Sequence, residues 1–479
     1  MTGKIKALHW NLQNNFFKFT RGRFLVDAAE NARKREIRFD MNSLARVAAQ
    51  SVGAARCIAI KKYPDGMFNK AFLIEVATMD FARKFLDTPA PRVYTWNSRA
   101  NSNPVGAEFI IMEKIKGVPL FQVWSTMTLP QKLQLSVLFL HYGSLYYTED
   151  TQPPAGNHFV KDSQAVRNSG FAISPATGRD WCDAGRSDLD FTGASLTQYL
   201  QAVGTREMKA IQSLEPPKTI VLFCGPKLYR PDTQKKLTAL AWYQHIVDAL
   251  IPKDAAITRP CLWHNDLHDD NVFSCHISPL FNYNPDPAFL NWDGLKPETL
   301  DLAPRPDLFR LLPEERSAAV QKYAIQNMFI GWRKLMHAKN PDLYQVVKFQ
   351  RTAAYGLIFL AHQMFKYGEA HFQSLLVDLQ DTWTDLPAVG DGNAPFLFDF
   401  SEAEIERIKM DSNGAVAGTE LVAEFKERMG DLWPDEGFIE HERYNDCKAA
   451  LDEVKGLILE QLAETDEEKA EYERYWPFE

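Results

Sequence analysis

With 479 residues, the chain is longer than one ordinary domain. Its apolar fraction of 45% and charged fraction of 24% are those of an average globular protein, which excludes a disordered, collagen-like or coiled-coil chain. No run of about 18 apolar residues occurs, so no transmembrane helix is predicted. The net charge of −8 is uneven: from Ser401 onward, 23 Asp and Glu residues accompany nine Lys and Arg residues. This acidic region predicts solvated helices and argues against nucleic acid as a partner.

The six cysteines are far apart and form no CxxC pair. This pattern is typical of reduced thiols in an intracellular protein, without a zinc site or a disulfide framework. The N-terminus lacks the apolar core of a secretory signal. Five Lys and Arg residues precede the first acidic residue, Asp27, a composition that is compatible with mitochondrial import. The expected location is therefore intracellular, either mitochondrial or cytoplasmic.

The first 125 residues mix helix and strand signals. Leu44, Val47 and Ala48 recur at helical spacing and predict a helix over residues 39–52. A Pro-Asp-Gly sequence predicts a turn at residues 63–66. Short strands are expected at 56–62, 68–74, 92–96 and 108–112, and a second helix at 75–85.

Beyond this region, helical periodicity dominates the sequence. Amphipathic spacing predicts helices at 129–147, 232–251, 314–337, 342–366, 370–383 and 436–462. Two long irregular stretches, 153–190 and 274–313, interrupt them. Loops of this length inside a compact protein are usually functional. The expected fold class is therefore α+β, with a small strand-bearing lobe followed by a large helical one.

The segment LWHNDLHDDNVF at residues 262–273 has the pattern of a phosphoryl-transfer loop. Transfer from ATP needs a carboxylate that accepts the proton of the attacking hydroxyl, and an oxygen ligand for the metal that holds the phosphates. Asp266 and Asn271, five positions apart, supply these two groups. His264 is expected to be a hydrogen-bond partner that supports the loop rather than the base.

Several segments of the chain resemble the aminoglycoside phosphotransferase-like kinases, and among them the fungal group called altered inheritance of mitochondria protein 9. They occur in family order and cover residues 16–54, 66–96, 103–124, 143–147, 262–273 and 278–302. The resemblance implies a two-lobed protein-kinase-like fold. Its parts would be an N-terminal extension at 1–35, a shortened N-lobe at 36–117, a helical C-lobe at 118–400 and an acidic helical extension at 401–479.

The resemblance also implies ATP and Mg²⁺ as cofactors and a small molecule as the phosphate acceptor. Asp266 would be the catalytic base, with His264 beside it, and Asn271 would be a metal ligand. Glu75 would orient an ATP-binding lysine, and Gly66 would belong to the turn that covers the phosphates. A hinge made of Met112, Glu113 and Ile115 would meet the adenine through its backbone.

Two intervals are shorter than the family pattern requires. Only eight residues, 67–74, separate Gly66 from Glu75, enough for one strand of about 26 Å, whereas a hairpin of two strands needs about twelve residues. The strand that carries the ATP-binding lysine therefore does not fit, and Lys61 and Lys62, which precede the turn, are the possible substitutes.

The second short interval follows Asn271. Only seven residues lie between Asn271 and Pro279, and this is too short for the hairpin that leads to the metal-binding Asp of the family. Asn291 or Asp293 is a less favoured alternative ligand.

Three hypotheses therefore remain open from the sequence. The chain is an ATP-dependent phosphotransferase in which another cation compensates for the missing lysine, or it is a pseudokinase that binds a ligand or protein partner. The third hypothesis is an aberrant splice or translation product of an active kinase, because family-like sequence continues up to both junctions, near 74/75 and 273/274.

Overall fold

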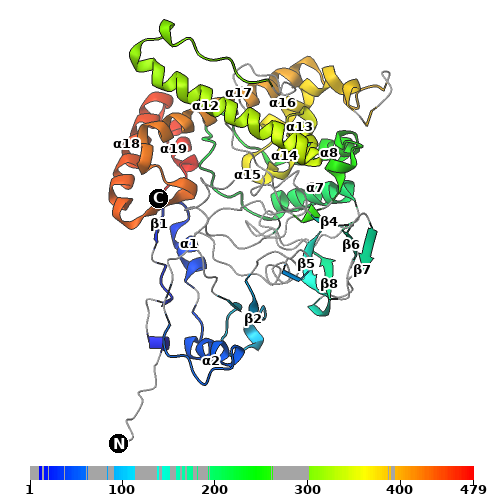
Figure 1. Ribbon diagram of the computed structural model, residues 1–479. Coiled ribbons are helices and arrows are strands. Elements are labelled where there is room, and N and C mark those ends of the chain that lie inside the picture. The colour runs from blue at the N-terminus through cyan, green and yellow to red at the C-terminus, as the bar shows by residue number, and fades with distance from the viewer. Residues whose placement is uncertain are drawn as a thin grey trace, which may run out of the picture.

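The structure of the chain is a computed structural model. It describes residues 10–12, 16–19, 21–36, 38–60, 62, 83–84, 91–113, 137–139, 143–150, 158–161, 164–167, 170–175, 181, 193, 195–259, 261–262, 301–386, 388–389 and 394–479. Most of the helices of the second half gather at one end of the molecule, whereas α2 and β2 lie at the other (Figure 1). None of the helices in these ranges is long and apolar enough to cross a membrane.

The first predicted helix and two of the predicted strands are confirmed. Helix α2 spans Met41–Ser51, and the Asp40 carboxylate caps it by accepting hydrogen bonds from the backbone N–H groups of Asn42 and Ser43. The Ser43 N–H and the Asn11 side-chain amide contribute most to lowering the pKa of Asp40 to about 2. Strand β2 (Val93–Asn97) pairs antiparallel with β3 (Phe109–Met112).

The strand predicted at 56–62 is wrong for residues 56–60, which form no strand. Cys57 and Ile60 pack against the cluster around Trp10 and Met41, but Ile58 is 74% exposed and no described strand pairs with this segment. The strand predicted at 68–74 lies outside the described residues. The helix predicted at 75–85 is described only at Arg83 and Lys84, which are helical.

The helix predicted at 129–147 is wrong where the structure describes it. Residues Val137–Phe139 form β4, and Ser144–Tyr147 form β5, which pairs with β8 (Phe171–Ser174). The Tyr147 ring stacks against both Trp96 and Phe171, at centroid distances of 5.9 and 5.3 Å. Aromatic packing across strands decided the conformation here, and the helical spacing did not.

The stretch expected to be irregular, 153–190, contains three strands. Strands β6 (His158–Lys161) and β7 (Gln164–Arg167) form a hairpin, and β8 follows. A four-stranded sheet has the order β7-β6-β4-β9, in which β9 is Cys261–Leu262. The sheet thus joins segments that are more than 100 positions apart in the sequence.

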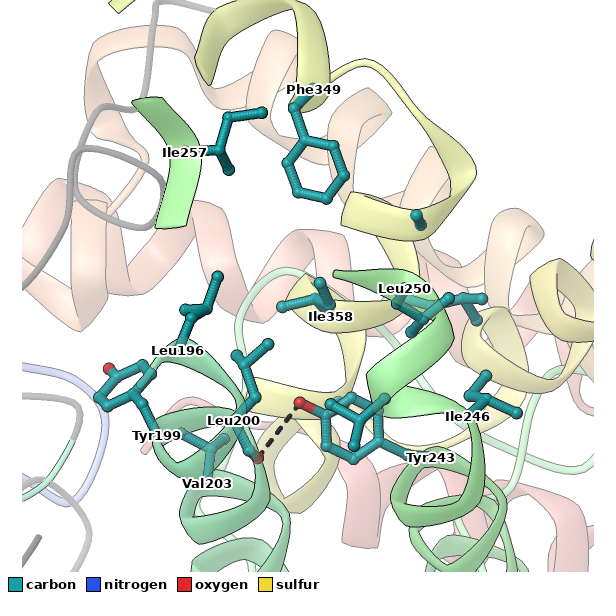
Figure 2. Packing of buried hydrophobic residues seen from close by; sticks show 14 of the residues in the cluster. Leu196, Tyr199, Leu200, Val203, Tyr243, Ile246, Leu250, Ile257, Phe349 and Ile358 are labelled. Atoms are coloured by element: carbon teal, nitrogen blue, oxygen red, sulfur yellow. Dashed lines mark hydrogen bonds between the residues drawn. The ribbon is translucent and has the colours of Figure 1, made fainter. Parts of the chain in front are cut away.

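Helices α7 (Leu196–Ser213) and α8 (Thr233–Leu250) pack together in the main apolar core. The helix predicted at 232–251 is confirmed by α8, whereas α7 was not predicted. Their apolar faces meet around Leu200, Val203 and Ile246, all of them fully buried (Figure 2). Within this core the Tyr243 hydroxyl donates a hydrogen bond to the backbone oxygen of Leu200, at 3.2 Å.

The helix predicted at 314–337 is confirmed by α12 (Pro313–Lys339). The single helix predicted at 342–366 is divided into α13 (Pro341–Phe349), α14 (Ala353–His362) and α15 (Met364–Tyr367). Thr352 starts α14 anew, because its side-chain oxygen accepts a hydrogen bond from the backbone N–H of Tyr355. Helix α16 (Ala370–Leu379) and a 3₁₀ turn cover the segment predicted at 370–383.

The acidic region is helical, as predicted. Its helices are α17 (Glu402–Met429), α18 (Tyr444–Leu462) and α19 (Asp466–Tyr475), and α18 begins eight residues later than predicted. The lost residues include β10 (Phe438–Glu440). The remaining 3₁₀ turns are Trp10–Leu12, Ala100–Ser102, Thr148–Asp150, Leu308–Arg310, Gln380–Asp385, Gly430–Leu432, Asp435–Gly437 and His441–Arg443.

The segment around β1 packs against the C-terminal region of the chain. Strand β1 (Gly22–Phe24) pairs antiparallel with β10, and α1 (Ala28–Arg35) follows β1. The Glu479 backbone N–H donates to the Leu25 oxygen at 2.8 Å. Leu25, Ile439, Leu451, Tyr472 and Phe478 share one apolar cluster. The N-terminal and acidic C-terminal segments are therefore neighbours in space.

Candidate functional site

Most of the predicted site residues lie outside the described part of the chain. These are Gly66, Glu75, Ile115, His264, Asp266 and Asn271, together with the alternatives Lys61, Asn291 and Asp293. Their roles remain predictions. Met112 and Glu113 are described, and the segments on both sides of residues 263–300 are described as well.

The chain is held firmly just before the predicted catalytic loop. Strand β9 pairs with β4, with Cys261 opposite Leu138 and Leu262 opposite Val137. The short helix α9 (Ala255–Thr258) precedes β9 and is capped by the Asp254 carboxylate, which accepts from the Ala256 N–H at 2.8 Å. Ile257 of α9 is 5% exposed and points toward Phe349 in the core (Figure 2). A rigid support of this kind is what a preorganised catalytic loop requires.

A second anchor holds the chain where it returns at residue 301. The Ala303 backbone N–H donates to the side-chain oxygen of Asn327 on α12, at 3.1 Å, and Ala303 is 5% exposed. The Asn327 amide in turn donates to the backbone oxygen of Tyr323, one helical turn earlier. The interval 263–300 is thus held by the β4–β9 pair at one end and by α12 at the other.

The described part of the predicted hinge is the end of β3. The Glu113 backbone N–H donates to the Arg92 oxygen at 2.7 Å, and the Glu113 carboxylate accepts from the Arg92 N–H at 3.3 Å. The same carboxylate lies 3.7 Å from the Arg83 guanidinium. Because the Glu113 N–H is already bonded within the hairpin, an adenine would have to meet other backbone groups of the hinge.

The predicted metal ligand Asn271 lies outside the described residues. Across the described ranges, no three His, Cys, Asp or Glu side chains gather closely enough to hold a metal ion. The prediction of Mg²⁺ therefore depends on Asn271 and on the residues of the undescribed intervals.

A buried polar cluster that the sequence did not predict lies between α8 and α16. The Tyr229 hydroxyl donates to the Glu369 carboxylate at 2.6 Å and accepts from the Glu369 backbone N–H at 3.2 Å. Glu369 is fully buried, and this burial raises the pKa of its carboxyl, which the Tyr229 hydrogen bond partly offsets. Burial likewise lowers the pKa of Lys236, whose ammonium donates to the backbone oxygen of Phe365.

A second buried cluster meets the first at Phe365. The Glu207 carboxylate accepts from the Phe365 N–H at 2.9 Å and lies 2.9 Å from the Arg206 guanidinium. The guanidinium carbon lies 4.9 Å from the centroid of the Trp181 ring. Lys236 and Glu207 thus bind the backbone oxygen and the backbone N–H of the same residue, Phe365, so these charges fix α15 against α7 and α8. All of them are buried, and we assign them a structural role.

No protein-family model matches the chain, and no solved structure matches it significantly. Two Aspergillus fumigatus proteins, each named subtelomeric hrmA-associated cluster protein, are 25% and 24% identical over 338 aligned positions. Each alignment covers 53% of this chain and 64% of the relative. Altered inheritance of mitochondria protein 9, mitochondrial, from Lachancea thermotolerans is 28% identical over 277 positions, which cover 46% of this chain and 44% of that protein. The chain is a distant relative of these fungal proteins.

The chain aligns with less than two thirds of the length of each relative. The alignment with the first relative uses 53% of 479 residues, about 254, which is about 84 fewer than its 338 positions. About 84 residues of the relative therefore have no counterpart in the aligned part of this chain.

Proposed function

We propose that the chain has the two-lobed α+β fold of the aminoglycoside phosphotransferase-like kinases and acts as a pseudokinase, which binds a ligand or protein partner and transfers phosphate poorly or not at all. The observation that carries this proposal is the combination of an intact loop pattern at 262–273 with two intervals that are too short for the groups around the triphosphate. Kinship with altered inheritance of mitochondria protein 9 supports the ancestry.

The arrangement around the loop supports the kinase-like part of the proposal. Asp266 would follow β9 by four residues, on a strand end that the sheet and the α9 contacts hold in place. The Arg83–Glu113 contact ties the end of the predicted Glu75 helix to the hinge strand. Both features are expected where a nucleotide cleft separates a strand-bearing lobe from a helical one.

Charge neutralisation supports the loss of activity. Phosphoryl transfer depends almost wholly on positioning the triphosphate and neutralising its charge. Removal of one preorganised partner typically lowers the rate by about 10²–10³. This chain lacks room for both the lysine strand and the strand hairpin that leads to the metal-binding Asp, and the roughly 84 relative residues without a counterpart are enough to contain both.

A second candidate function is an active ATP-dependent phosphotransferase, which the retained Asp266 and Asn271 favour. Thermal unfolding with millimolar Mg-ATP separates the two. A nucleotide present at 100 times its dissociation constant should add about 2.7 kcal/mol to stability. We expect no shift, and a clear upward shift would contradict the loss of nucleotide binding.

The substitution Asp266→Ala tests the loop directly. The active phosphotransferase would be established if the wild type turns over ATP, Asp266→Ala abolishes this turnover and Asp270→Ala preserves it. Asp270 is the matched control, because it lies in the same loop and has no predicted role.

Two further points belong to the proposal. The name of the Lachancea relative supports a mitochondrial location for this chain, which imaging of a fluorescent fusion would test. Transcript reads across the 74/75 and 273/274 junctions would separate a genuine pseudokinase from an aberrant product. Continuous reads support the pseudokinase, and reads with extra coding sequence at both junctions support the aberrant product.

A further inference from the structure

One long helix combines exposed apolar residues with an excess of positively charged residues. Between residues 316 and 339, α12 carries five Lys and Arg residues and no Asp or Glu. Its two carboxylates belong to the first turn, where Glu315 accepts from the Leu312 backbone N–H. The acidic residues of the protein are concentrated elsewhere, from Ser401 onward. This part of α12 therefore carries a net positive charge, although the whole protein is negative.

The apolar residues of α12 form a stripe on its outer side. Val320 is 46% exposed and Met328 is 61% exposed, and Ala324 lies exposed between them at the same four-residue spacing. The inner side is marked by Ile330, which is 1% exposed. The stripe therefore points away from the core, in agreement with the outer position of α12 in the fold (Figure 1).

Cations flank this stripe. Arg316 and Lys334 are both exposed and lie five whole turns of helix apart, so they project on the same side. Neither forms an ion pair with a described residue, and the Arg316 guanidinium donates to the backbone oxygen of Leu311. Long side chains of this kind can extend their charged heads past neighbouring apolar groups.

The turn before α12 adds a protruding aromatic ring. Phe309 is 97% exposed in the 3₁₀ turn Leu308–Arg310, and Leu312 is 58% exposed. The Phe309 side chain thus has almost no contact with the rest of the chain. A fully exposed Phe beside cations is unfavourable in water, but it is suited to the boundary between lipid headgroups and acyl chains.

We propose that Phe309, Arg316, Val320, Met328 and Lys334, here called the α12 surface, bind the face of an anionic phospholipid bilayer. The chain would lie on the membrane and not cross it, with apolar side chains in the boundary region and the cations at the headgroups. Charge complementarity selects this occupant, because neither cation forms an ion pair with a described residue and no Asp or Glu occurs between residues 316 and 339. This inference is independent of the proposed phosphotransferase ancestry.

Vesicle flotation of the full-length protein tests the proposal. We expect binding to vesicles of phosphatidylcholine with phosphatidylserine, and much weaker binding to vesicles of phosphatidylcholine alone. Each cation near such a surface contributes about a fivefold factor in affinity, so Arg316→Gln with Lys334→Gln should weaken binding about 25-fold. Phe309→Ser with Met328→Ser should also weaken it, and salt should do the same to the wild type.

Helix α17 offers a matched control. Met410 is 68% exposed on α17, which carries seven carboxylates and four cations, so Met410→Ser should leave vesicle binding unchanged. Thermal unfolding of every variant verifies that it is folded. The proposal is overturned if the wild type does not bind anionic vesicles, or if the α12-surface variants bind them as well as the wild type does. It is also overturned if the α12-surface variants still bind anionic vesicles but no longer bind an RNA oligonucleotide or a second copy of the chain. The surface would then serve one of those partners and not a membrane.

Discussion

Helices α12 and α17 are almost equal in length, 27 and 28 residues, yet they are built for opposite surroundings. α17 buries residues along most of its length, from Ile408 to Met429. The buried residues described on α12, Ile330, Arg333 and Met336, all lie in its C-terminal half. The length and amphipathic spacing of a helix therefore do not predict how much of its surface is buried in the folded protein.

The glycines of the two helices make the same contrast sharper. A Cβ atom on Gly418 of α17 would lie 2.1 Å from the backbone oxygen of Phe223, whose N–H donates to the Gly418 oxygen. A Cβ atom on Gly331 of α12 would meet nothing within 4 Å. One glycine permits the close approach of another backbone, and the other only weakens its helix.

The largest expected effect is that of Gly418→Ala. The added methyl group must displace the backbone at Phe223, which is 4% exposed, and overpacking of this kind costs about 1–3 kcal/mol. Urea unfolding should show a lower midpoint with an unchanged slope. A midpoint equal to that of the wild type would mean that the close contact between α17 and the Phe223 segment does not form.

The next effect concerns the pH dependence of stability beside α17. The folded pKa of Glu369 exceeds its ordinary value near 4.5 because the carboxyl is buried, so the folded state binds this proton more tightly than the unfolded state does. The contribution of Glu369 to stability is therefore complete below about pH 4.5 and is lost as pH rises through its folded pKa. Glu369→Gln should reduce this loss of stability by roughly 1 kcal/mol for each unit by which the folded pKa exceeds the unfolded pKa.

Glu404 provides the control, because its contribution to stability has the opposite dependence on pH. The hydrogen bonds from Ser401 lower the pKa of the exposed Glu404 at the start of α17, so its contribution is present above about pH 4.5 and is lost as pH falls. Glu404→Gln should therefore remove stability at neutral pH. A Glu369→Gln variant whose pH profile matches that of the wild type would contradict the assigned burial of this carboxyl.

The smallest expected effect is a gain. Gly331→Ala adds a methyl group in open space and replaces a poor helix former by the best one, which should stabilise the protein by about 0.5–1 kcal/mol. Thermal unfolding would report this as a modest rise in midpoint. A destabilised Gly331→Ala variant would show that this side of α12 is covered, and would thereby weaken the case for the α12 surface as well.

The accuracy of the sequence prediction followed the range of the interactions. The helix at 39–52 and the strand at 108–112 were predicted well, because a local cap at Asp40 and a short apolar run are sufficient to specify them. The helix expected at 129–147 failed in its described part, since the strands there depend on partners at Ala172 and Cys261. No local pattern reports partners that lie so far along the chain.

The candidate site divides in the same way. The sequence predicted a catalytic loop at 262–273, and the structure adds the anchors at Ile257 and Ala303 that hold the chain on both sides of it. The buried clusters around Glu369 and Glu207 were not predicted. Tyr229 and Glu369 are 140 positions apart, and each reads as an ordinary residue in its own segment.

By itself, the sequence determined the mixed architecture, the acidic helical C-terminal region and the loop pattern that points to phosphoryl transfer. Only the tertiary structure decided that the N-terminal strand β1 pairs with β10 of the C-terminal region, which helix faces are covered, and which glycines lie against another backbone. The reason is physical. Caps, turns and periodicity act over a few residues, whereas burial and strand pairing depend on which distant segments meet in space.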